Sequence, residues 1–332
     1  MVEVSVTAPA RLHLGFLDLH GGLGRHFGSL GVAVSDVETR VVASKRDPHE
    51  QNADSAEQAR AAHAAAQICR HFGLCEQPAV SLEKIIPPHA GLGSGTQLAL
   101  AVGRALLTYF GRDDVQTPKI AEITGRGARS GIGIGVFDSG GFVVDLGRGA
   151  ETLVPPQLTR MAFPEDWPIL LMRDLSSVGI SGSAEKSAFK NLAPMSETLV
   201  SSLCRHTLMG VLPSIAERDF ERFAGSLEII QAAIGDYFAP CQGGQRFTSP
   251  VIGELADVIK KRHPEIVVGQ SSWGPTGFAF CPHADVAADI ESAFCTGELI
   301  ADIPAQVRLS IHKARNQGAE IIARDGARKV AG

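Results

Sequence analysis

A glycine-dense loop that runs directly into an amphipathic helix constrains the fold of this chain most. The loop and helix occupy residues 87–110, PPHAGLGSGTQLALAVGRALLTYF, with the glycines at 91–95. The first turn of a helix has unpaired backbone N–H groups and the positive end of the dipole, and glycine lets an anion approach closely. The stretch therefore predicts either a phosphate or diphosphate site or an ordinary tight loop before a core helix. Apolar residues at helical spacing define the helix: Leu98, Val102, Leu106 and Phe110.

The composition limits both the ligands and the compartment. The 332 residues are 44% hydrophobic and 20% charged, which is enough for more than one buried core and predicts two domains. A net charge of −5 argues against a general nucleic-acid or membrane surface, so a local cluster of donors must bind any polyanion. The six cysteines show no CxxC pair, and we find no signal peptide or apolar run of membrane-spanning length. We therefore expect a soluble, cytoplasmic protein with no nucleic-acid or membrane partner.

The N-terminal segment predicts two strands joined by a polar, glycine-rich loop. Apolar and polar residues alternate from residue 2, and a second strand is indicated for 31–43. The loop between them carries Asp18, His20, Arg25 and His26, and each of these residues alone is typical of a surface turn. The preceding strand, however, contains Arg11 and His13, and arginine is costly in an apolar strand unless an anion pairs with it.

A second glycine-rich stretch, residues 125–135, carries Arg126, Arg129 and Ser130. Guanidinium groups among glycines and a serine suit a second phosphate or a carboxylate. The alternative is a long surface loop with solubilising arginines, and the stretch fits both. Residues 154–168 contain several prolines and are the best candidate linker.

The remaining elements are irregularly ordered. Strands mixed with helices at irregular intervals predict an α+β second half built on an antiparallel sheet. In the first half, a helix is expected up to residue 72, a strand at 79–86, a helix from residue 117 and a strand at 142–146. In the second half, strands are expected at 167–172, 266–269, 277–281 and 307–312, a polar loop at 173–185, and helices at 196–216, 220–238, 250–263 and 284–294.

Together, these stretches resemble the GHMP superfamily. The motifs are PARLH at residues 9–13, PPHAGLGSGT at 87–96, and a small-residue loop between two late strands. Within the superfamily, the chain more closely resembles the β-ribofuranosylaminobenzene 5′-phosphate synthases. Four stretches carry this resemblance, in the right order over nearly the whole chain: residues 13–18 with 24–25, then 91–100, 126–142 and 271–276.

The resemblance implies a two-domain α+β fold. Residues 1–160 would form a domain like ribosomal protein S5 domain 2, and residues 161–332 a ferredoxin-like domain. It also implies a glycosyltransferase of the phosphoribosyltransferase type, in which phosphoribosyl diphosphate (PRPP) condenses with 4-aminobenzoate or a hydroxybenzoate. The products would be a C-riboside 5′-phosphate, CO2 and diphosphate, on the route to methanopterin. Mg²⁺ is the expected cofactor, and relatives suggest a homodimer.

The same resemblance assigns roles to residues. Diphosphate or the 5′-phosphate would lie at the helix terminus, with help from Arg11 and Arg25, and His13 is a further predicted substrate- or phosphate-binding residue. Arg11, Asp18 and Arg25 are the predicted catalytic residues. Asp18 would either ligate Mg²⁺ or face the cationic sugar carbon. The other predicted binding residues are Gly91, Gly93, Ser94, Gly95 and Thr96 for phosphate, Arg129, Ser130 and Gly131 for the carboxylate or the other phosphate, and Ser272, Gly274, Thr276 and Glu185 for the pocket wall.

Two other functions fit parts of the sequence. An ATP-dependent small-molecule kinase of the GHMP group would also use the glycine loop and magnesium. The loop at residues 273–276, WGPT, lacks the consecutive glycines usual in those kinases. A non-catalytic nucleotide-binding protein is the second alternative, and clustered Arg, Asp and His beside a glycine loop argue against it.

Overall fold

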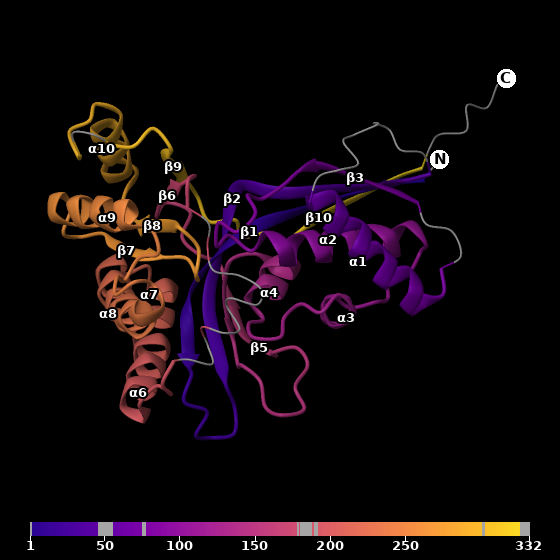
Figure 1. The fold of residues 1–332 in the computed structure, drawn as a ribbon, viewed down its shortest axis with the longest axis horizontal. Coiled ribbons are helices and arrows are strands. Elements are labelled where there is room, and N and C mark those ends of the chain that lie inside the picture. The colour runs from indigo at the N-terminus through magenta and orange to yellow at the C-terminus, as the bar shows by residue number, and fades with distance from the viewer. Residues whose placement is uncertain are drawn as a thin grey trace.

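Two antiparallel sheets form the framework of the molecule (Figure 1). The computed structural model describes residues 2–45, 56–74, 78–177, 179, 188, 192–300 and 303–325. The first sheet has six strands in the order β10-β1-β2-β4-β5, with β3 paired to β2. Its strands are β1 (Val2–Asp18), β2 (Phe27–Ser44), β3 (Ala79–Lys84), β4 (Phe142–Asp145), β5 (Gln157–Met161) and β10 (Glu320–Asp325).

The first sheet is organised by the long β1–β2 hairpin. In β1, Val4 and Val6 pack into a core beneath the helices, whereas Leu12 and Leu14 pack into a core shared with the second half. The register shift between Pro9 and Ala10 marks the place where the strand changes from one core to the other. Both halves of β1 are therefore buried, and the chain can place polar groups beyond the shift on the face opposite the leucines.

Helices cover one face of this sheet (Figure 1). The buried residues of α2, including Leu98, Val102 and Leu106, pack on β1, on β2 and on α1. This stripe is the one predicted from the sequence, and burying it stabilises the first half at about 25 cal/mol per Å² of apolar surface. The helices are α1 (Ala56–Phe72), α2 (Ser94–Tyr109), α3 (Thr117–Ile123) and α4 (Ile132–Ser139).

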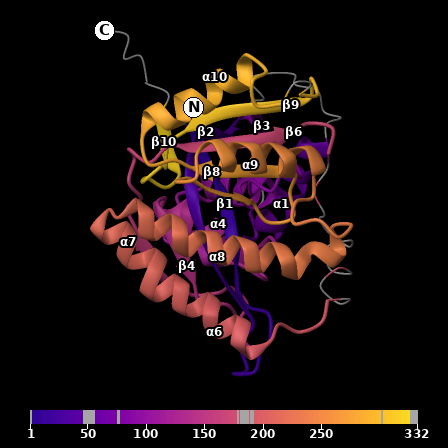
Figure 2. The same ribbon diagram turned by 90° about the vertical axis from the view of Figure 1, so that its left-hand side faces the viewer.

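The second sheet has four strands in the order β7-β8-β6-β9. Numbered along the chain, this is the 2-3-1-4 order of a βαββαβ unit, so the expected ferredoxin-like arrangement is confirmed. Helices α8 and α9 lie beside this sheet (Figure 2). Its strands are β6 (Ile169–Asp174), β7 (Val267–Gln270), β8 (Thr276–Phe280) and β9 (Val307–His312), and its helices are α6 (Glu197–His206), the π-helix η1 (Thr207–Val211), α7 (Leu212–Glu217), α8 (Phe220–Phe238), the 3₁₀ helix η2 (Ala239–Cys241), α9 (Pro250–Arg262) and α10 (Ala284–Cys295).

Three elements differ from the sequence-based expectations. The stretch 125–135, expected to be a loop, ends in helix α4, and the candidate linker 154–168 contains β5, which pairs with β4. The chain also ends in an unexpected strand, β10, which pairs with β1. The range 161–332 predicted for the second domain therefore includes one strand of the first sheet.

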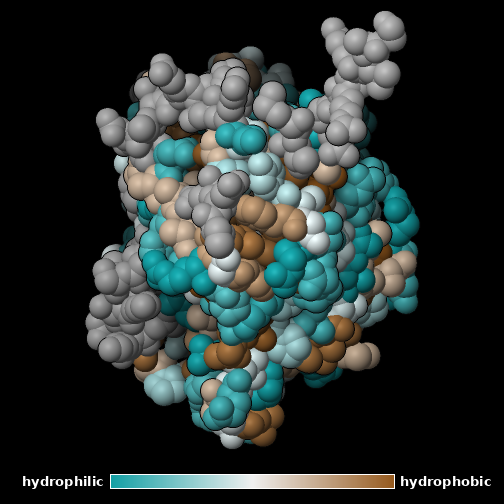
Figure 3. Space-filling view, turned by 90° about the vertical axis from the view of Figure 1, so that its right-hand side faces the viewer, coloured by the Kyte–Doolittle hydropathy of each residue, from teal (hydrophilic) through white to brown (hydrophobic). Residues whose placement is uncertain are grey.

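The outer surface is mixed in polarity. On the face shown in Figure 3, hydrophobic residues lie in small groups among hydrophilic ones. Within the described ranges, the helices are too short or too polar to cross a lipid bilayer.

Candidate active site

The alternation of β1 determines which side chains face the site. Leu12 and Leu14 point into the shared core, so Arg11 and His13 project from the opposite face of the strand. That face meets the glycine loop that precedes α2, because the Arg11 backbone N–H donates to the Leu92 carbonyl at 3.1 Å. The sheet thus holds a charged and an aromatic polar group next to the loop.

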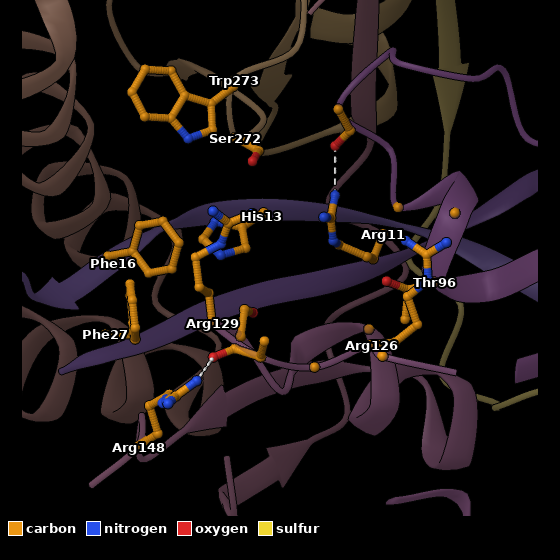
Figure 4. Close-up of a pocket in the computed structure, with 18 of the residues that line it drawn as sticks. Arg11, His13, Phe16, Phe27, Thr96, Arg126, Arg129, Arg148, Ser272 and Trp273 are labelled. Carbon is orange, nitrogen blue, oxygen red and sulfur yellow. Dashed lines mark hydrogen bonds between the residues drawn. The ribbon is translucent and has the colours of Figure 1, made fainter. Parts of the chain in front are cut away.

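A cavity of about 1230 Å³ opens at this place (Figure 4). Segments from both halves of the chain line it: β1, the loop after it, both glycine-rich stretches and the loop before β8. Its described lining residues include three histidines, His13, His26 and His89, but no aspartate or glutamate. A cavity surrounded by fixed positive charge attracts anions, and low-dielectric walls strengthen the effect. Five arginines line it: Arg11, Arg60, Arg126, Arg129 and Arg148.

The N-terminus of α2 forms one end of this cavity. The helix begins at Ser94 after Gly93, whose φ of 86° is the left-handed conformation that glycine adopts without strain. Gly93, Ser94, Gly95 and Thr96 all line the cavity. The Thr96 N–H donates to the Gly93 carbonyl at 3.1 Å, and the first N–H groups of a helix have no partner within the helix itself. The helix terminus predicted to bind phosphate therefore forms part of the cavity wall, and its binding role stays a prediction.

Two arginines flank this terminus. Arg11 donates from its guanidinium to the Gly91 carbonyl at 2.5 Å. Arg126 lies over the helix start, since a Cβ built on Gly95 would be 3.2 Å from its terminal nitrogen. The Arg126 Nε is buried and has no hydrogen-bond partner among the described residues. Burial, followed by the charge of Arg60, lowers the pKa of Arg126, while Glu57 opposes this shift.

Arg60 reaches the same end from helix α1. It donates to Glu57 at 2.9 Å, and its other terminal nitrogen lies 2.9 Å from His89 Nε2. A guanidinium can only donate, so His89 Nε2 accepts this hydrogen bond. We call the α2 N-terminus with Arg11, Arg60 and Arg126 the anion cradle.

The loop before β8 closes the cavity from the second half of the chain. The Ser271 hydroxyl donates to the Gly91 carbonyl at 2.7 Å, and the His13 backbone N–H donates to the Ser271 Oγ at 3.0 Å. Gly91 and Gly274 approach so closely that a Cβ on either one would collide with the backbone of the other loop. The predicted wall residues Ser272 and Gly274 do line the cavity.

A buried carboxylate holds the second glycine-rich stretch. Asp145, on β4, accepts from the backbone N–H of Gly131 at 2.9 Å and of Gly147 at 2.8 Å, and from the Ser29 hydroxyl. Burial raises the pKa of Asp145, and these donors oppose the shift. Ser130 and Arg129 line the cavity, whereas the Gly131 N–H is used by Asp145 and Gly131 is outside the lining.

Aromatic rings form the other end of the cavity. The His13 and Phe16 rings lie 4.7 Å apart between centroids, and Phe16 and Phe27 lie 5.6 Å apart. Trp273 closes the same end and packs on Phe238 at 4.3 Å. Figure 4 shows these rings at one end of the cavity, with Arg11, Thr96 and Arg126 at the other. The rings therefore gather at one end of the cavity, where Arg129 and Arg148 also lie, and the anion cradle forms the other end.

Two predicted catalytic residues lie just outside this lining. Asp18 Oδ1 accepts from the backbone N–H groups of His20 and Gly21, both at 2.8 Å, so it shapes the β1–β2 loop. Arg25 is exposed and donates to the carbonyls of Leu146 and Gly147. These contacts position the neighbouring loop residues that do line the cavity, and the predicted catalytic roles of Asp18 and Arg25 stay predictions.

The remaining predicted site residues do not line the cavity or lie outside the described residues. Thr276 is fully buried in β8 and is not part of the lining, and Glu185 lies outside the described residues. Across the described part of the chain, no three His, Cys, Asp or Glu side chains gather as a metal site. The donors around the cavity, arginines and histidines without a described carboxylate, do not fit a magnesium ion held by the protein.

Several lining residues were not selected as site residues from the sequence. Arg126 and His26 stood in stretches already considered, so proximity to glycines was a usable signal. Arg60 is one charged residue on an alanine-rich helix, and no local pattern distinguishes it from a surface arginine. Further lining residues with larger side chains that were not selected are His89, Arg148, Phe16, Phe27 and Trp273.

Solved structures of low sequence identity share the fold. A homoserine kinase from Cytophaga hutchinsonii superposes with a TM-score of 0.65 at 15% identity, covering 96% of this chain and 97% of the kinase. The Streptococcus pneumoniae phosphomevalonate kinase gives a TM-score of 0.67 at 12% identity, covering 95% and 100%. The family described as GHMP kinases N terminal domain matches residues 59–143. These similarities establish the two-domain α+β GHMP fold.

Curated relatives are more similar in sequence. The β-ribofuranosylphenol 5′-phosphate synthase of Archaeoglobus fulgidus is 32% identical, and the alignment covers 94% of this chain and 97% of the relative. The enzyme of that name from Methanothermobacter thermautotrophicus is 30% identical over 97% of this chain and 99% of the relative. With this identity over nearly its full length, the chain belongs to the β-ribofuranosylphenol 5′-phosphate synthase family, an enzyme family within the GHMP superfamily.

Proposed function

We propose that the protein is a C-riboside-forming glycosyltransferase that joins PRPP to 4-hydroxybenzoate or 4-aminobenzoate and releases CO2 and diphosphate. The observation that carries this proposal is a single cavity with an anion cradle at one end and aromatic rings at the other. The names of the relatives, which denote synthesis of a ribofuranosylphenol 5′-phosphate, point to the same reaction. In this proposal the reaction serves methanopterin synthesis.

The anion cradle supplies the binding energy for the phosphorylated sugar. PRPP carries a diphosphate and a 5′-phosphate, and backbone amides at a helix N-terminus bind such groups without a net charge of their own. The guanidinium groups of Arg11 and Arg126 add charge-assisted hydrogen bonds, which are about twice as strong as neutral ones. A diphosphate bound here is stabilised as a leaving group.

The bond changes need little help from a base. The bond from ribose C1 to the diphosphate oxygen breaks, and its electron pair leaves with diphosphate. The ring carbon that bears the carboxylate then bonds to C1, and CO2 departs, returning its bonding electrons to the ring. Catalysis consists of holding the two substrates in line and stabilising the departing anion. The described cavity lining has arginines and no carboxylate, which suits stabilisation of the departing diphosphate. In this proposal, magnesium takes part only as an ion that accompanies PRPP.

A direct assay tests the proposal. The protein is incubated with PRPP and 4-hydroxybenzoate labelled in the carboxyl carbon, and trapped CO2 and free diphosphate are measured. The proposal predicts equal amounts of both products, dependent on both substrates. Since the solved structures that share the fold include kinases, a parallel incubation with ATP is needed. ATP consumption without CO2 release would support the kinase alternative, and no turnover of either substrate would support a binding protein.

A further inference from the structure

We propose that the aromatic end of the cavity is a separate subsite for an aromatic carboxylic acid. In this subsite, the ring packs against the rings of Phe16, Phe27 and Trp273, and His13 donates its Nε2–H to an oxygen of the acid. The inference rests on the proposed function and deepens it, because it assigns the two substrates to opposite ends of one cavity.

The state of His13 follows from its contacts. His13 Nδ1 accepts a hydrogen bond from the Gly15 backbone N–H at 3.3 Å, so in the neutral ring the proton is on Nε2. The side chain is 3% exposed, and its Nε2 is buried without a hydrogen-bond partner among the described residues. Burial, and then the charge of Arg11, lower the pKa of His13 to about 3; a hydrogen bond with its own backbone opposes the shift, and the charge of Arg129 adds to it. His13 is therefore an uncharged donor with one N–H group left for a ligand.

The buried Nε2–H group of His13 indicates that a ligand at this end of the cavity supplies a hydrogen-bond acceptor. A buried N–H without a partner costs about 1–3 kcal/mol, so a ligand oxygen at this position is favoured. Figure 4 shows the Arg129 side chain extending toward His13, which adds a positive charge beside the same position. An oxyanion bound by a neutral N–H and a guanidinium, with an apolar body packed on rings, matches an aromatic carboxylate.

Backbone strain supports a built site. The described non-glycine residues with positive φ are five in number, and three of them line the cavity: Phe27 at 74°, His89 at 57° and Ser272 at 56°. For a bulky residue such as Phe27 this conformation is a genuine outlier, and such strain gathers at functional sites. The ring of Phe27 contacts that of Phe16, and Ser272 directly precedes Trp273 in the chain. The loops thus present these rings to the cavity at a conformational cost.

The spacing along β1 fits two substrates that react with each other. Arg11 and His13 are two residues apart on one face of a strand, which separates them by about 7 Å. That gap accommodates a ribose between a diphosphate at Arg11 and a carboxylate at His13. The ring carbon that carries the carboxylate would then face the sugar carbon that loses diphosphate.

The experiment separates binding of the two substrates. Binding of 4-hydroxybenzoate, with diphosphate at saturation, is measured by calorimetry for the wild type, His13→Leu, His13→Gln and Phe27→Ala. We expect at least about tenfold weaker binding for His13→Leu and Phe27→Ala, from the loss of one hydrogen bond or of ring packing. His13→Gln places an amide N–H near the Nε2 position and should recover most of the affinity. Phe110→Ala, at the far end of α2 and outside the cavity lining, is the matched control and should bind as the wild type does.

Folding and function are checked independently. Stabilisation by diphosphate in a thermal melt should be the same in all variants, because the anion cradle is intact. Weaker diphosphate binding in His13→Leu with unchanged 4-hydroxybenzoate binding would overturn the inference, as would absence of 4-hydroxybenzoate binding to the wild type. If the wild type binds 4-hydroxybenzoate through His13 but releases no CO2, the subsite stands and the proposed reaction fails.

Discussion

Arg126 shows how a single residue reports on the ligand. A guanidinium is expensive to bury, and this one keeps an Nε without a partner in the described part of the chain. An anion at the α2 terminus would satisfy it. We expect Arg126→Gln to raise the KM for PRPP by about tenfold or more, since a hydrogen bond to a charged group contributes about 1.5–3 kcal/mol. Steady-state kinetics check this, with Arg112→Gln as control because Arg112 is half-buried and outside the cavity lining. Equal KM values in the two variants would contradict the role.

The uncharged state of His13 predicts a dependence of stability on pH. Folding lowers the pKa of His13 from 6.5 to about 3, so between these values the unfolded chain binds a proton that the folded protein does not. Stability contributed by this residue is therefore present above pH 6.5 and is lost as the pH falls toward 3. In His13→Gln this titration is absent, so the difference in unfolding free energy, wild type minus variant, should decrease by about 1 kcal/mol per pH unit below 6.5. Urea unfolding between pH 7.5 and 4.5 measures it, and a constant difference would show that His13 titrates normally.

At the scale of elements, the contact between two loops sets the cavity. Gly91 and Gly274 touch through their backbones, so a side chain on Gly274 must separate the α2 terminus from the loop before β8. Overpacking of this kind costs about 1–3 kcal/mol. Gly274→Ala should therefore lower the free energy of unfolding by that amount and weaken diphosphate binding, as measured by urea unfolding and calorimetry. Gly225→Ala on α8, where an added Cβ meets nothing within 4 Å, is the control; similar losses in both variants would contradict the loop contact.

The sequence predicted elements well where the pattern was local. The α2 stripe, the alternation in β1 and the strands around Trp273 are all visible within short windows, and the structure confirms them. The α4 helix was missed because its glycines, Gly133 and Gly135, are poor helix formers; Gly135 is required by packing, since a Cβ there would crowd Val143. The strand β10 was missed because its pairing with β1 joins the two ends of the chain, and no local pattern encodes that contact.

At the scale of the whole molecule, the site is where the two halves meet. The glycine loops and Arg11 could be assigned from short motifs, because the residues that form a helix N-terminus are neighbours in the sequence. Arg60, Arg148 and Phe27 come from a helix, a loop and a hairpin that only tertiary packing brings together. Their assembly around one cavity explains how a fold shared with kinases can present an aromatic surface beside an anion cradle.

The most direct test of the account is a crystal structure of the protein with diphosphate and 4-hydroxybenzoate bound. The account predicts diphosphate oxygens within hydrogen-bond distance of the Ser94 and Gly95 amides and of the Arg11 and Arg126 guanidinium groups. It also predicts that the ring of 4-hydroxybenzoate packs against Phe16 and Phe27. Diphosphate bound away from the α2 terminus, with Arg11 and Arg126 making no contact to it, would contradict the central claim.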